Sequence, residues 1–117
     1  MIVELDVFSG RPNPRWELGE AARHQLQKLL TRLAPAGAAP DPPALGYRGF
    51  CWNDASGAYR AFGGYLRTPR TTFDDPSVSI EQFLLEQLPP EFEFLRARIF
   101  GELARRRRGP RSPDPGS

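Results

Sequence analysis

Cationic and aromatic side chains are concentrated in one short segment, residues 8–16, which reads FSGRPNPRW. Its two prolines restrict the backbone, so the neighbouring side chains have little conformational entropy left to lose. Arg11 and Arg15 carry planar, fork-shaped donors that suit a carboxylate or a phosphate, and Trp16 can stack on a planar group. The segment therefore predicts a rigid binding loop, with Arg11, Asn13, Arg15 and Trp16 as candidate binding residues.

A purely structural interpretation of this 8–16 loop stays open. Proline and asparagine at the end of a strand are common turn chemistry. In that interpretation the two prolines terminate the preceding strand, Trp16 fills the core, and Arg11 and Arg15 are solvated. Only the position of these side chains in the folded chain can separate the two interpretations.

Three further arginines, Arg48, Arg60 and Arg67, lie in an aromatic, glycine-punctuated stretch over residues 45–67. Basic and aromatic residues on a sheet face can bind single-stranded nucleic acid by stacking. Packing of long arginine side chains along the sheet is the interpretation we favour. Arg48 is the fifth candidate binding residue.

The basic character of the chain comes from its last residues. Residues 105–117 hold five arginines against one aspartate, which leaves 11 basic and 13 acidic groups in residues 1–104. The body therefore carries a net charge of −2, and we do not expect it to bind nucleic acid. The arginine run 105–108 suits a helix end, and weak nucleic-acid binding through this tail stays an alternative.

Most catalytic and metal-binding constellations have no counterpart in the sequence. His24 is the one histidine, and we interpret it as a helix-surface residue. Cys51 is the one cysteine, so there is no internal disulfide, and we interpret it as a small buried hydrophobe. We predict no catalytic residues, no metal site and no cofactor. An enzyme or enzyme subunit using Glu4 or Asp6 near the 8–16 loop stays an alternative.

Hydrophobic patterning gives the expected elements. Apolar and acidic residues alternate over residues 2–8, which predicts a half-buried strand. Apolar residues recur at helical spacing over residues 18–33, which predicts a helix with Gly19 as its N-cap and Pro35 as its stop. Residues 45–53 and 58–67 predict a β-hairpin, with residues 68–77 as a loop. Helices follow from Ser79, with Gln82 in a capping box, and from residue 90.

The predicted fold class is therefore α+β. We expect a small three-stranded, mainly antiparallel sheet with about three helices, in the order β-α-β-β-α-α. Residues 1–104 form a single domain that contains a flexible Pro/Ala connector at 35–44, and residues 105–117 form a disordered Arg/Pro-rich tail.

The 8–16 loop also carries a resemblance. Together with the strand at 3–7 and the stretch LGYRGF at 45–50, the chain resembles a group of small bacterial proteins of unknown function. These proteins share a strand followed by Phe-Ser-Gly-Arg-Pro-Asn-Pro-x-Trp, and the resemblance covers most of residues 2–90. It implies no particular activity.

The function predicted from the sequence is a non-catalytic accessory or binding module. It would recognise a protein, a peptide or a small anion through the 8–16 loop. The chain begins without a basic, apolar leader, contains no long apolar run and carries a lone thiol, so we expect a cytoplasmic protein with no membrane partner.

Overall fold

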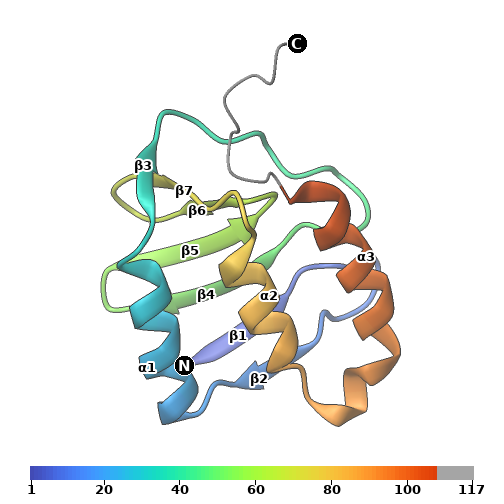
Figure 1. Ribbon diagram of the computed structural model, residues 1–117. Coiled ribbons are helices and arrows are strands. Elements are labelled where there is room, and N and C mark those ends of the chain that lie inside the picture. The colour runs from blue at the N-terminus through green and yellow to red at the C-terminus, as the bar shows by residue number, and fades with distance from the viewer. Residues whose placement is uncertain (108–117) are drawn as a thin grey trace.

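In a computed structural model, which describes residues 1–107, the chain forms a seven-stranded sheet with its helices packed on one face (Figure 1). The strand order is β2-β1-β4-β5-β6-β7-β3, and all neighbouring strands are antiparallel. In chain order the elements are β1 (Ile2–Leu5), β2 (Arg15–Glu17), α1 (Glu20–Leu30), β3 (Ala34–Ala36), β4 (Phe50–Asp54), β5 (Gly57–Phe62), β6 (Tyr65–Arg67), β7 (Thr72–Asp74), α2 (Ser79–Glu86), the 3-10 helix η1 (Pro90–Leu95) and α3 (Arg96–Arg106).

Alternation in the strands decides which side chains meet the helices. In β1, Val3 and Leu5 are fully buried, whereas Glu4 points to the opposite face. The same alternation in β4 buries Phe50 and Trp52 in the core. Helix α2 lies between α1 and α3 and contacts both, so the core is the layer between these helices and the strands (Figure 1).

The predicted α+β class and the three α-helices are present, but the predicted three-stranded sheet is wrong. The second strand of the expected hairpin divides at Gly63 and Gly64, whose φ angles of 66° and 83° fit a tight two-residue turn between β5 and β6. The segment expected as a loop at 68–77 then returns as β7, paired with β6.

The predicted order β-α-β-β-α-α is also wrong, because two short strands lie outside the expected ones. β2 begins at Arg15, within the last two residues of the 8–16 loop, and pairs with β1. β3 lies partly within the expected connector and contains Pro35. Proline has no N–H to donate, and an edge strand tolerates it where the backbone position faces away from the sheet; β3 is at one edge.

The helices begin close to where the sequence places them. Gly19 is the N-cap of α1, as predicted. The capping box predicted for α2 is wrong: Asp75 accepts hydrogen bonds from Ser79 Oγ at 2.7 Å and from the Ile80 amide at 2.9 Å. The N-cap of α2 is Val78 rather than Ser79, and Asp75 caps the Ile80 amide in the first turn of the helix.

Two segments bear on the predicted domain limits. Arg67 donates to the carbonyls of Ala39 at 2.8 Å and Pro40 at 3.0 Å, so the connector is fastened to β6. Helix α3 continues through Arg106, two residues into the predicted tail. Residues 108–117 lie outside the described residues, and the rest of that tail stays a prediction.

Candidate functional site

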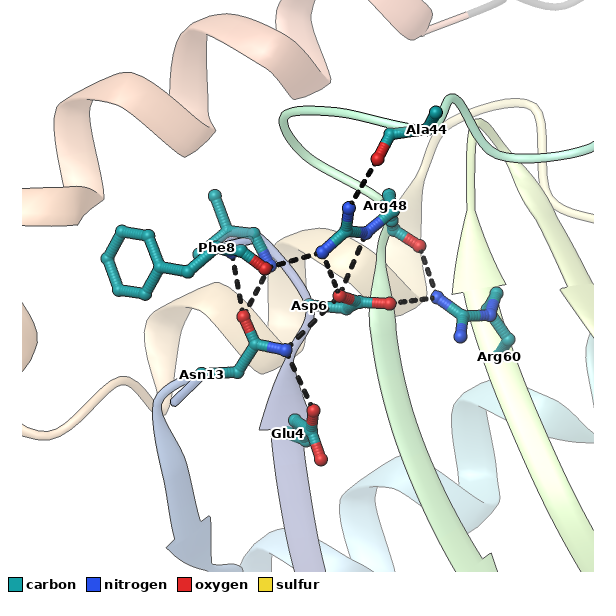
Figure 2. A network of polar contacts seen from close by, with 8 residues as sticks. Glu4, Asp6, Phe8, Asn13, Ala44, Arg48 and Arg60 are labelled. Carbon is teal, nitrogen blue, oxygen red and sulfur yellow. Dashed lines mark hydrogen bonds and ion pairs between the residues drawn. The ribbon is translucent and has the colours of Figure 1, made fainter. Parts of the chain in front are cut away.

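The 8–16 loop connects β1 to β2 and is closed by the side chain of Asn13 (Figure 2). Its Oδ1 accepts hydrogen bonds from the backbone amides of Val7 at 3.0 Å and Phe8 at 2.7 Å. Its Nδ2 donates to Glu4 Oε2 at 2.9 Å and to Asp6 Oδ1 at 3.2 Å. A primary amide has two donors and two acceptor positions, so Asn13 is fully used in holding the loop to β1.

Asp6 is the centre of a charged network beside this loop (Figure 2). Arg48 donates a hydrogen bond from Nε to Asp6 Oδ1 at 2.9 Å, and its Nη2 lies 2.8 Å from the same oxygen as an ion pair. Arg60 donates to Asp6 Oδ2 from Nη1 at 2.9 Å. These contacts connect the end of β1, the segment before β4, and β5 through one carboxylate.

Arg48 extends the network into the backbone of the loop and of the connector. Its Nη2 donates to the Phe8 carbonyl at 2.6 Å, and its Nη1 donates to the Ala44 carbonyl at 2.7 Å. Arg60 donates in turn to the Arg48 carbonyl at 2.7 Å. Arg48 is 17% exposed, and its donors are directed at internal acceptors, so it is a holding residue rather than a free anion ligand.

The charge state of Asp6 follows from its surroundings. Burial by itself would raise the pKa of this carboxyl, but the hydrogen bonds and positive charges of Arg48 and Arg60 outweigh burial. The pKa therefore lies below its ordinary value of 3.8. A carboxylate held ionised in this way is a poor proton donor or acceptor near neutral pH, which weakens the alternative of an enzyme that uses Asp6.

Arg11 and Arg15 are the two loop cations that stay accessible. The Arg11 guanidinium lies 3.8 Å from the centroid of the Phe8 ring, and Arg11 is exposed. Arg15 is 65% exposed, and its Nε is 3.8 Å from Glu4 Oε1, at the outer limit of an ion pair. The ring contact restrains Arg11 without using its hydrogen-bond donors.

Trp16 does not belong to the accessible surface of the loop. Only 8% of it is exposed, and its ring packs edge-on against Phe50 with 6.4 Å between centroids. The strand alternation explains this, because Trp16 lies opposite Val3 on the helix-covered face of the sheet. The structural interpretation therefore holds for Trp16.

Other candidate chemistry in the described chain is sparse. Cys51 is partly exposed on the face opposite the helices, and burial raises the pKa of its thiol to about 11, so it is protonated at neutral pH. His24 is exposed on α1. Within residues 1–107 no group of three potential metal ligands comes together. No helix there is long and apolar enough to cross a membrane.

A second buried polar network lies beneath the helices and was not predicted. Glu81, in the first turn of α2, accepts hydrogen bonds from Tyr47 Oη at 2.5 Å, the Gly63 amide at 3.1 Å and the Gly64 amide at 2.9 Å. Glu81 is 1% exposed. Burial raises the pKa of this carboxyl above its ordinary value of 4.5, and outweighs the three hydrogen bonds.

The five residues predicted as a site thus divide into three groups. Asn13 and Arg48 hold the loop, Arg11 and Arg15 extend from it, and Trp16 belongs to the core.

No family model, no curated protein and no solved structure matches this chain.

Proposed function

We propose that this protein is a non-catalytic binding module of the cytoplasm that recognises an acidic peptide segment of a partner protein. The observation that carries the proposal is a contrast within the 8–16 loop. Asn13 and the backbone near Phe8 are fastened by internal hydrogen bonds, whereas Arg11 and Arg15 are exposed cations. A fixed loop presents such side chains at a smaller entropic cost of binding.

The position of the loop beside a sheet edge favours a peptide over a small anion. β2 is the end strand of the sheet. The Leu5 amide donates to the Pro14 carbonyl at 2.9 Å, so the antiparallel alternation turns the backbone groups of Arg15 and Glu17 away from β1. An extended segment can pair with these groups, and its acidic side chains would then lie near Arg15.

A fluorophore-labelled polyglutamate peptide provides the test, with anisotropy as the measurement at low ionic strength. We expect Arg11→Ala with Arg15→Ala to weaken binding about tenfold, the sum of two exposed charge contacts. Arg23→Ala with Arg32→Ala is the matched control, because both residues are exposed on or just after α1 and the net charge changes equally. Equal weakening by the two double variants would overturn the proposal.

Strand pairing is tested separately with the same peptide carrying N-methyl groups at alternate backbone amides. Methylation removes ladder donors and keeps every side-chain charge. We expect the methylated peptide to bind more weakly than the parent, with amide NMR shifts of the parent complex confined to residues 9–17. Unchanged affinity would reject recognition at the β2 edge.

A further inference from the structure

A second candidate site lies far from the 8–16 loop in the sheet order, over the ends of β5, β6 and β7. It is a pocket of about 470 Å³ between these strands and the C-terminal end of α1. Its apolar walls come from Leu30, Tyr59, Leu66, Pro69 and Phe73. This volume falls in the range of small-molecule sites.

The pocket exists because the helical layer ends before the sheet does. α1 ends at Leu30, which is only half-buried, and the chain then leaves for the edge strand β3. The outer wall is fixed by Gly57 at φ 129°, where a Cβ atom would lie 2.7 Å from Pro69 Cγ. The β4–β5 turn can therefore pack closely on Pro69, which gives the pocket a preformed rim.

The Tyr59 ring forms one wall of the pocket, and one of its two faces is covered by another aromatic ring. Tyr59 stacks on Trp52 with 5.4 Å between ring centroids and an interplanar angle of 7°. Because Trp52 occupies one face of the Tyr59 ring, the rest of the ring is available to the pocket. A planar aromatic body can pack against Tyr59 and Phe73 there.

Two polar side chains at the rim of the pocket make internal hydrogen bonds, whereas the charged side chain there makes none. Ser56 Oγ donates to Asp54 and contacts Tyr59 Oη at 3.0 Å. Thr68 Oγ1 donates to the Thr71 carbonyl at 2.9 Å. Arg70 is exposed, and in the described part of the chain its guanidinium has no hydrogen bond or ion pair. Among residues 1–107, no other residue that lines the pocket carries a charge.

We infer that this pocket binds a small aromatic carboxylate, with the ring against Tyr59 and Phe73 and the carboxylate at Arg70. The apolar walls supply burial for the ring, and the guanidinium supplies the bidentate partner that a carboxylate prefers. The site shares no residue with the 8–16 loop and does not depend on the function proposed for that loop.

Naphthoate is the test ligand, and neutral naphthalenemethanol is its matched control. We expect naphthoate to cause saturable amide NMR shifts at Tyr59 and residues 66–73. Arg70→Gln keeps a polar side chain at an exposed position, so it should leave the fold intact. It should weaken naphthoate about fivefold, the effect of one exposed charge contact, and leave naphthalenemethanol unchanged.

Two further variants separate this site from the rest of the surface. Arg32→Gln removes an exposed arginine outside the pocket, and the Arg11→Ala, Arg15→Ala variant alters only the loop. Naphthoate should bind both as tightly as it binds the parent. Shifts centred elsewhere, an absence of saturation, or equal weakening of both ligands by Arg70→Gln would each overturn the assignment.

Discussion

Asp6 and Glu81 are two carboxylates that each fasten separate segments together, and their electrostatic surroundings are opposite. Asp6 is 15% exposed and accepts hydrogen bonds from Arg48 and Arg60, which hold its pKa below the ordinary value against the effect of burial. Glu81 is 1% exposed and accepts from Tyr47 and two backbone amides, and burial raises its pKa.

The contrast shows which side of the protein depends on charge. An ionised Asp6 is needed to compensate two partly buried guanidinium groups, so the geometry of the 8–16 loop rests on ion pairing. Glu81 has no cationic hydrogen-bond partner among residues 1–107, and its donors are neutral. The contact between α2 and the β5–β6 turn therefore depends less on the ionisation of Glu81 than the 8–16 loop depends on the ionisation of Asp6.

The largest effect is expected from Asp6→Asn. This change leaves Arg48 and Arg60 without their counter-charge, and should lower the free energy of unfolding by about 2–3 kcal/mol. Urea unfolding measures it. Glu4→Gln is the control, since Glu4 is 36% exposed and its ion pair with Arg15 is long, and it should cost less than about 0.5 kcal/mol. Similar losses in both variants would contradict the central role of Asp6.

Acid sharpens the same comparison. Because folding lowers the pKa of Asp6, its stabilisation is present above pH 3.8 and is lost as the pH falls through the lower folded value. We expect the stability of the parent protein to fall over that range. The Asp6→Asn variant should lack this part of the fall. If the free energy of unfolding fell with acid by the same amount in both proteins, Asp6 would not be responsible.

Asn13→Ala should have the next largest effect, a loss of about 2 kcal/mol, because it removes four hydrogen bonds from a half-buried position. Asn13→Asp is an informative partner. It keeps the acceptor for Val7 and Phe8 but puts a negative charge against Glu4 and Asp6. Its destabilisation at neutral pH should shrink in acid, whereas that of Asn13→Ala should not shrink in the same way.

Glu81→Gln should cost only about 1 kcal/mol at neutral pH, because the amide keeps an acceptor for some of the three donors. Folding raises the pKa of Glu81, so its contribution is fully present below pH 4.5 and is lost as the pH rises through the folded value. Urea unfolding over this range should show stability falling with pH in the parent and a flatter profile in Glu81→Gln. A slope unchanged by the substitution would reject this account.

The parts of the fold that the sequence predicted correctly are those with several periods of patterning. Residues 2–8 show alternation, and α1 shows helical spacing behind its Gly19 cap. β2, β3, β6 and β7 have three residues each. Three residues are too few to show a recognisable alternation of apolar and polar side chains. Gly63-Gly64 was a usable hairpin signal, and predicting one continuous strand over residues 58–67 merged β5 with β6.

The candidate site was predictable only as a loop, not as a set of roles. Alternation along residues 2–8 already places Asp6 on the same side as Glu4, but its partners Arg48 and Arg60 are 42 and 54 residues away. Their meeting depends on the pairing of β1 with β4 and β4 with β5. Trp16 was misjudged as a contact residue because the burial of β2 cannot be known before its pairing with β1.

The smallest effect is expected from Tyr47→Phe, which removes one neutral donor from Glu81 and should cost about 0.5–1 kcal/mol. Loss of that hydrogen bond should raise the pKa of Glu81 further, so the fall in stability moves to higher pH.

A double-mutant cycle of Tyr47→Phe with Glu81→Gln should show a coupling free energy of about 0.5 kcal/mol or more. With Asp6→Asn the effects should add, because no side chain or amide within residues 1–107 donates a hydrogen bond to both carboxylates. Strong coupling to Asp6→Asn would instead join the two regions into one unit and remove the contrast between them.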